Sequence, residues 1–119
     1  PEIAMVGLTE QVAKAERREV KLSRFNFAAN GKAVAMGETD GLVKIVADAV
    51  TGKVLGMHIM GPHASDLIME GTLAIRKGLT AQDIAHTIHP HPSLSETVME
   101  TAHGIDGPIV HQAILKGRR

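Results

Sequence analysis

The residues best suited to chemistry in this chain stand together between His89 and Glu96. The segment reads His-Pro-His-Pro-Ser-Leu-Ser-Glu, with each histidine directly before a proline. Proline restricts the residue before it to an extended backbone, so we expect the imidazoles of His89 and His91 to point to roughly the same side. Two imidazoles are too few for zinc, which takes at least three protein ligands, and the other histidines are scattered. No metal site is predicted.

Glu96 allows two interpretations. In the first, it forms a capping box with Ser93: the serine side chain accepts from the Glu96 amide, and the Glu96 carboxylate accepts from the Ser93 amide. In the second, a turn folds His91 back over the helix start, within reach of Glu96, and a cis His91–Pro92 bond would help to shape that turn. A carboxylate beside an imidazole fixes its tautomer and favours its protonated form, which makes a general acid–base. Local structure alone favours the cap.

The surrounding elements follow from residue spacing. Alternating apolar residues predict strands over 42–47 and 54–60, joined by a loop in which Gly52 has a positive φ. Gly56 faces outward from its strand, which indicates that something packs closely there. A broken strand is expected over 24–34, with a turn at Asn30–Gly31. Helical spacing and caps predict helices over 9–17, 64–77, 80–86 and 93–102, followed by an irregular start to the tail.

The helix predicted over 64–77 is apolar on two sides. One stripe contains Gly71 and Ala74, and a second patch consists of Met69 and Leu73. A helix that is apolar on two sides needs two partners. One is the sheet, and we expect the other to be a second subunit, since Gly71 and Ala74 would let another backbone come close. The alternative is a helix central to its own domain.

Composition excludes several classes of protein. The chain has 119 residues, 13 basic and 13 acidic side chains, and no cysteine. It therefore has no disulfide framework, thiolate metal site or cysteine nucleophile, and its zero net charge argues against a nucleic-acid partner. No apolar run approaches the ~20 residues of a membrane span, and no secretion signal opens the chain. We expect one domain, 1–119, with no membrane partner. The chain also lacks a phosphate-binding loop. If His91 and Glu96 transfer protons, their substrate and redox partner must therefore be supplied from outside this chain.

Over residues 1–103 the chain resembles the C-terminal interface domain of the flavin-dependent pyridine nucleotide–disulfide oxidoreductases. Within that family it is most similar to the dihydrolipoamide dehydrogenases. The motif at 89–96 carries the resemblance, together with flanking segments that agree in the right order: 1–4, 6–10, 28–33, 40–44 and 54–62.

The resemblance implies an α+β fold, with an antiparallel sheet of about five strands flanked by helices, and a two-fold homodimer. It implies that His91 is the acid–base for a disulfide exchange with dihydrolipoamide and that Glu96 orients it. The backbone at His91–Pro92 would approach the FAD of the partner subunit, so His91 and Pro92 are the expected cofactor-binding residues. FAD and NAD are implied for the parent enzyme, and none is expected on this chain alone.

The implied partners are a second copy, the remaining domains of the parent enzyme and the lipoamide-bearing components of a 2-oxoacid dehydrogenase complex. The implied compartment is the bacterial cytoplasm or the mitochondrial matrix. Because the redox cysteines are absent, we expect these residues to be a piece of that enzyme and inactive alone. Two alternatives stay open. Glutathione reductases have a similar end, although His89 and Leu94 favour the lipoamide enzyme, and a free-standing dimerisation module could keep the motif.

Overall fold

Strands of alternating apolar residues build one antiparallel sheet. The computed structural model describes residues 2–107. Within that range the strands are β1 (Glu2–Gly7), β2 (Val20–Asn26), β3 (Leu42–Asp48) and β4 (Val54–Gly61), in the order β1-β4-β3-β2. On the inner face Ile45 pairs with Met57 and Val43 with Ile59, and all four side chains are buried. The α+β prediction is confirmed, with four strands in the described part of the chain rather than about five.

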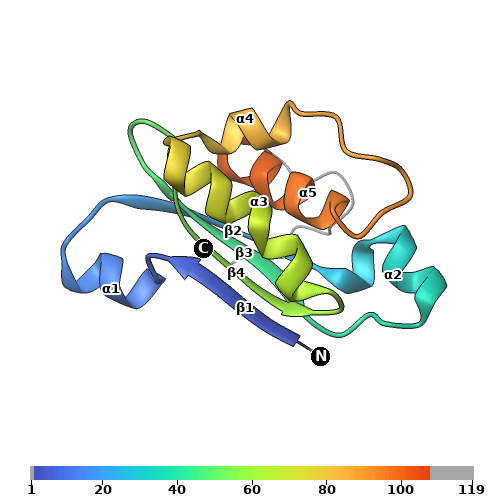
Figure 1. Cartoon of the computed structure of the whole chain (residues 1–119). Helices are drawn as coiled ribbons and strands as arrows, with labels where there is room; N and C mark the ends of the chain where they lie inside the picture. Colours follow the sequence, from blue (N-terminus) through green and yellow to red (C-terminus); the bar gives the residue numbers. More distant parts are fainter. Residues whose placement is uncertain (1, 108–119) are drawn as a thin grey trace.

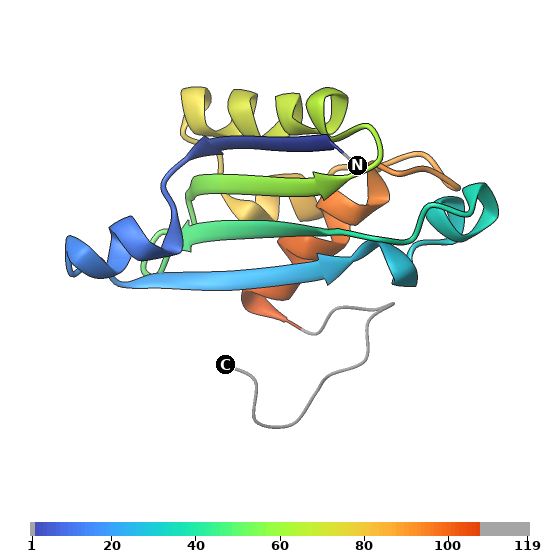
Figure 2. The ribbon, with the colours of Figure 1, turned by 90° about the horizontal axis from the view of Figure 1, so that it is seen from below.

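Helices α3 (Ala64–Lys77), α4 (Ala81–Ala85) and α5 (Glu96–Asp106) cover one face of this sheet (Figures 1 and 2). α3 packs on β1 and β4, α5 packs on β2 and β3, and α4 packs against α5. Thr80 and Asp83 form a capping box at the start of α4. The end of the helix predicted over 64–77 is confirmed, with Gly78 at the C-cap of α3. So is the positive φ of Gly52 in the β3–β4 loop. None of the helices among residues 2–107 has the length and apolar character needed to cross a membrane.

The inner stripe of α3 serves the domain's own sheet. A Cβ at Gly71 would lie 2.7 Å from the sulfur of Met57 on β4, and Ala74 is buried. The expectation that these two residues admit the backbone of a second subunit is therefore wrong. The second apolar patch of α3 faces solvent, because Met69 is 60% exposed and Leu73 is 54% exposed.

Helix α1 (Glu10–Ala15) lies in the connection between the two edge strands, β1 and β2. The Thr9 side chain caps this helix by accepting from the Val12 amide, so the helix predicted over 9–17 exists in a shorter form. A Cβ at Gly56 would collide with the carbonyl oxygen of Leu8. The predicted close packing against Gly56 is thus confirmed, and the group that packs there is the chain's own backbone.

The prediction for 24–34 is wrong in its second half. β2 ends at Asn26, a 3-10 turn covers Phe27–Ala29, and a short helix, α2, spans Gly31–Met36. Asn30 is the N-cap of α2, and its side-chain oxygen accepts from the Ala33 amide at 2.9 Å. Asparagine is among the strongest N-cap residues. That bond, with the complete burial of Ala33, overrides the turn preference of the Asn-Gly pair.

The last helix begins and ends later than predicted. We expected a helix over 93–102 and an irregular start to the tail, but α5 spans Glu96–Asp106. Gly104 costs about 1 kcal/mol inside a helix. Two contacts offset it: Ile105 is buried, and Asp106 accepts from the Lys21 ammonium at 2.8 Å. The rest of the predicted tail lies outside the described residues.

Candidate acid–base site

The segment 86–95 connects α4 to α5 and is held by side-chain hydrogen bonds rather than by a ladder of backbone bonds. The Ser93 hydroxyl donates to the Pro90 carbonyl oxygen at 2.5 Å and lies 2.9 Å from the Ser95 hydroxyl. The His91–Pro92 peptide bond is cis, as expected. These contacts fold the segment back over the first turn of α5.

The fold brings His91 and Glu96 together. The Nδ1 atom of His91 lies 2.9 Å from Oε1 and 3.0 Å from Oε2 of Glu96. The same carboxylate accepts from the Ser93 amide at 3.0 Å. One carboxylate thus serves both interpretations of the sequence. The capping box is only half formed: the N-cap of α5 is Ser95 rather than Ser93, and no side-chain cap bond is made there.

The two members of this pair differ in exposure, and that difference defines what the pair can do. The His91 side chain is 77% exposed, whereas the Glu96 side chain is 14% exposed. An imidazole whose Nδ1–H donates to a carboxylate presents Nε2 as a proton acceptor, and the carboxylate stabilises the imidazolium that results. The arrangement suits proton transfer to and from a group that approaches the chain from outside.

Asn30 supports the site from a distant part of the chain. While its oxygen caps α2, its side-chain nitrogen donates to the Ser93 carbonyl oxygen at 3.0 Å. The residue is buried. The turn expected at Asn30–Gly31 did not predict this role. The N-cap preference of asparagine was the available signal for half of it, but nothing local indicates a partner 63 residues away.

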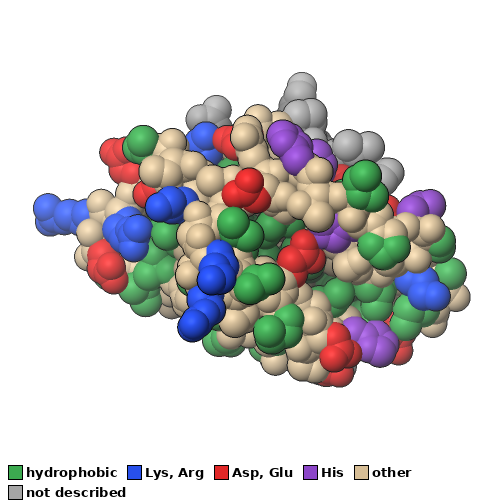
Figure 3. Space-filling view, turned by 45° about the horizontal axis from the view of Figure 1, so that its top comes forward, with side chains coloured by type: hydrophobic (Ala, Val, Ile, Leu, Met, Phe, Trp, Pro, Cys, Tyr) green, Lys and Arg blue, Asp and Glu red, His purple; other side chains and the backbone are tan. Residues whose placement is uncertain are grey.

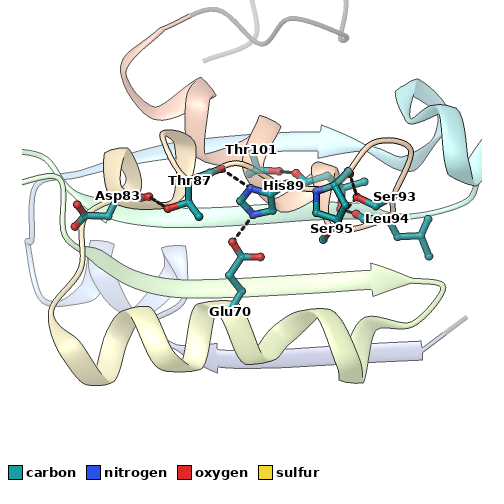
Figure 4. Close-up of polar contacts among 10 residues, drawn as sticks. Glu70, Asp83, Thr87, His89, Ser93, Leu94, Ser95 and Thr101 are labelled. Atoms are coloured by element: carbon teal, nitrogen blue, oxygen red, sulfur yellow. Dashed lines mark hydrogen bonds and ion pairs between the residues drawn. The ribbon is translucent and has the colours of Figure 1, made fainter.

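His89 lies in different surroundings from His91. Its side chain is 6% exposed, with Nδ1 2.7 Å from the Thr87 carbonyl oxygen and Nε2 2.5 Å from Oε1 of Glu70 on α3 (Figure 4). The expectation that both imidazoles share one side is wrong, because α3 supplies a carboxylate that holds His89 inward. Glu70 was missed as well, since no short-range pattern relates it to His89.

The remaining histidines are not gathered into a site in the described part of the chain. His58 Nε2 lies 3.0 Å from the Leu8 carbonyl oxygen, and the rings of His86 and His103 are 6.3 Å apart. Among residues 2–107 no group of three or more His, Cys, Asp or Glu side chains could hold a metal ion. His111 lies outside the described residues.

Comparison with known protein families gives a match over residues 1–102. The matching family is described as the pyridine nucleotide-disulphide oxidoreductase, dimerisation domain. The chain is 50% identical over 111 residues to a dihydrolipoyl dehydrogenase of Bacillus subtilis (strain 168), covering 93% of this chain and 23% of the relative. It is 49% identical over 113 residues to a dihydrolipoyl dehydrogenase of Corynebacterium glutamicum, covering 93% of this chain and 24% of the relative.

Solved structures agree with these sequence relatives. LpdA from Mycobacterium tuberculosis superposes with a TM-score of 0.82 and 32% sequence identity, over 87% of this chain and 22% of that one. RclA from Escherichia coli, an HOCl-induced flavoprotein disulfide reductase, superposes with a TM-score of 0.80 and 25% identity, over 84% of this chain and 23% of that one. The chain thus spans about a quarter of the length of the proteins it matches.

Proposed function

Because the chain belongs to the dimerisation-domain family of the pyridine nucleotide-disulphide oxidoreductases, we propose that it supplies the acid–base pair of a dihydrolipoamide dehydrogenase. The observation that carries the proposal is the contact between an exposed His91 and a nearly buried Glu96. In this proposal residues 1–119 are the C-terminal interface domain of a longer enzyme. The domains that bind FAD and NAD lie elsewhere in that enzyme, and the chain alone is inactive.

The proposed chemistry is a proton transfer coupled to disulfide exchange. Nε2 of His91 takes the proton of a dihydrolipoamide thiol, and the thiolate attacks one sulfur of a disulfide on the partner subunit. A mixed disulfide forms, the enzyme S–S bond breaks, and the leaving sulfur takes the electron pair. The leaving sulfur takes the proton of the second substrate thiol, and this thiol displaces the other enzyme sulfur from the mixed disulfide. Lipoamide is released, and the first proton remains on His91. Glu96 holds the Nδ1–H and stabilises the imidazolium throughout.

FAD, when bound by the rest of the enzyme, supplies the route by which electrons leave the resulting dithiol for NAD. His91 and Pro92 fit a position beside the FAD, since both residues are exposed at the surface of this chain. Their role as the backbone segment next to the partner's flavin is part of the proposal. So are the lipoamide-bearing components of a 2-oxoacid dehydrogenase complex as partners, and the bacterial cytoplasm or mitochondrial matrix as the compartment.

The proposed dimer contact lies on the outer face of α3. Hydrophobic side chains gather over this face among charged ones (Figure 3), and Met69 and Leu73 are the exposed large hydrophobic residues of α3. A second copy of the domain would remove them from water. Substituting Leu73→Asp in a full-length enzyme should therefore weaken the dimer in sedimentation velocity. The control is Val50→Asp, which changes an 88% exposed valine in the β3–β4 loop. Equal sedimentation of the two variants would contradict this contact.

A chimera tests the activity. This chain would replace the matching segment of the B. subtilis dihydrolipoyl dehydrogenase to which it is 50% identical. We expect dihydrolipoamide-dependent reduction of NAD, and His91→Gln should lower kcat by about 10²–10⁴-fold while the flavin absorbance stays. The control is His63→Gln, at an exposed histidine before α3. Full activity of His91→Gln would contradict the assigned role, and a chimera that prefers oxidised glutathione would favour the glutathione reductase branch.

A further inference from the structure

His89 and Glu70 form a second imidazole–carboxylate pair that the proposed reaction leaves unused. A carbonyl oxygen can only accept, so the 2.7 Å contact to Thr87 makes Nδ1 of His89 a donor. The 2.5 Å contact between Nε2 and Oε1 of Glu70 then gives the second ring nitrogen a partner as well. With both ring nitrogens bound and the side chain 6% exposed, this imidazole has a fixed orientation and no access to a substrate.

The pair is one link in a chain of contacts that joins two helices to the site segment. The Thr87 hydroxyl donates to the Asp83 carbonyl oxygen in α4 at 2.6 Å, the Thr87 carbonyl oxygen accepts from His89, and His89 reaches Glu70 on α3 (Figure 4). The segment is thus attached to both α3 and α4 immediately before it reaches His91.

The backbone between His89 and His91 has few soft torsions. Pro90 has a fixed φ, and His89 and His91 each precede a proline, which restricts their own backbone. On the other side, Ser93 is bonded to Pro90, Glu96 and Asn30. His91 therefore lies between two anchors, and an orientation fixed at His89 passes along a stiff backbone to His91.

We propose that His89 and Glu70 are positioning residues, which hold the 86–95 segment on α3 so that the imidazole of His91 meets Glu96. The proposal rests on the proposed function in one respect, since that function gives His91 its task. Replacing a polar pair that is largely shielded from water by apolar groups is often neutral or stabilising, so stability alone does not account for this contact. Its place two residues before His91 does.

The test uses this chain, labelled with ¹⁵N, and the variant Glu70→Ala. In the wild type the ring nitrogen shifts of His91 should show a protonated Nδ1, and the Ser93 amide should exchange slowly because it donates to Glu96. In Glu70→Ala we expect the His91 ring to show the mixed tautomers of a free imidazole, and Ser93 exchange to accelerate at least about tenfold. Glu70→Gln keeps a hydrogen-bonding group at the same position, since its amide can donate to or accept from Nε2 of His89, and should restore both signals.

The control is Asp66→Ala, which removes the carboxylate of an exposed pair on the same helix, 3.5 Å from His63. If the Glu70→Ala variant does not fold, the His89→Gln variant is measured instead. A glutamine side chain cannot bond both the Thr87 carbonyl oxygen and the Glu70 carboxylate as the two ring nitrogens of histidine do. A folded Glu70→Ala or His89→Gln variant with unchanged His91 and Ser93 signals would overturn the proposal. So would an equal change in Asp66→Ala.

The chimera separates this proposal from the proposed function. There Glu70→Ala should lower kcat by about tenfold, as expected for a displaced catalytic group, and leave the flavin absorbance intact. If His91→Gln retains full activity, the proposed function fails, while the ¹⁵N measurements still decide whether Glu70 orients His91. If His91→Gln is inactive and Glu70→Ala changes no His91 signal, only the positioning role fails.

Discussion

His91–Glu96 and His89–Glu70 use the same two functional groups within a few residues of each other, under opposite physical conditions. The first pair is local, separated by five residues, and its histidine is 77% exposed. The second joins two elements across nineteen residues, and its histidine is 6% exposed. An exposed ion pair contributes little to stability but leaves a ring nitrogen within reach of other molecules. A buried histidine has no such access, and its carboxylate partner fixes its position instead.

The largest expected effect separates the two glutamates by activity. In the chimera, Glu96→Gln should lower kcat by roughly 10³-fold, because an amide cannot stabilise the imidazolium as a carboxylate does. The substituted glutamine side chain still offers an oxygen to the Ser93 amide, so the start of α5 should stay intact. Glu70→Gln, which keeps the hydrogen bond to His89, should change kcat by less than about threefold. Steady-state kinetics with dihydrolipoamide measure both, and similar losses in the two variants would erase the proposed difference in roles.

The next prediction concerns stability, where we expect the larger loss at Glu70 rather than in the His91–Glu96 pair. Glu70→Ala leaves the His89 imidazole buried without its carboxylate, which should cost about 2 kcal/mol of unfolding free energy. His91→Ala removes an exposed side chain and should change it by less than about 0.5 kcal/mol. Urea unfolding of the chain at neutral pH measures both. A His91 variant as unstable as the Glu70 variant would show that the exposed pair is structural.

The same contrast explains which features of the molecule could be predicted from sequence. The half of the site that was predicted, His91 with Glu96, is a contact across five residues. Local structure left this pair open but favoured the Ser93 cap, and the family resemblance then favoured the pair. The half that was missed, Glu70 and Asn30, depends on α3 and α2 lying against the segment, and packing of distant elements leaves no mark on local spacing. The α+β fold class was implied by the family resemblance, and the β3–β4 hairpin and α3 followed from periodicity. α2 did not, because its single capping bond competes with a strong turn signal.

Two variants of Asn30 separate its cap on α2 from its hydrogen bond to the 86–95 segment. Asn30→Ala removes both the cap on the Ala33 amide and the bond to the Ser93 carbonyl oxygen, and should cost about 1–2 kcal/mol. Asn30→Ser keeps a good N-cap residue but is too short to reach Ser93. We therefore expect serine to restore most of the unfolding free energy and little of the kcat lost in the chimera. Gln11→Ala, at an exposed amide on α1, is the control. Full recovery of kcat with serine would mean that the bond to Ser93 does not position the site.

The smallest expected effect concerns the ion pair of Glu10, which lies away from the site. Its contribution to stability is a reference for the His91–Glu96 and His89–Glu70 pairs. Glu10 on α1 accepts from the Lys44 ammonium at 2.9 Å and from Arg24 at 3.3 Å. The hydrogen bond from Lys44, opposed by partial burial and aided by the charges of Lys44 and Arg24, lowers the pKa of the Glu10 carboxyl. Because the folded pKa lies below the unfolded one, this contribution is complete above the unfolded pKa and is lost as the pH falls through the folded pKa.

Glu10→Gln should therefore cost about 0.5–1 kcal/mol of unfolding free energy at pH 7, and the difference from the wild type should vanish on acidification. Urea unfolding at pH 7 and at stepwise lower pH measures this, with Glu38→Gln at an exposed position as the control. A loss at pH 7 as large as that of Glu70→Ala would mean that the Glu10–Lys44 pair contributes as much to stability as the His89–Glu70 pair. In that case the contribution to unfolding free energy would no longer distinguish the His89–Glu70 pair from the Glu10 pair. Only the effect of His89–Glu70 on the His91 ring would set it apart.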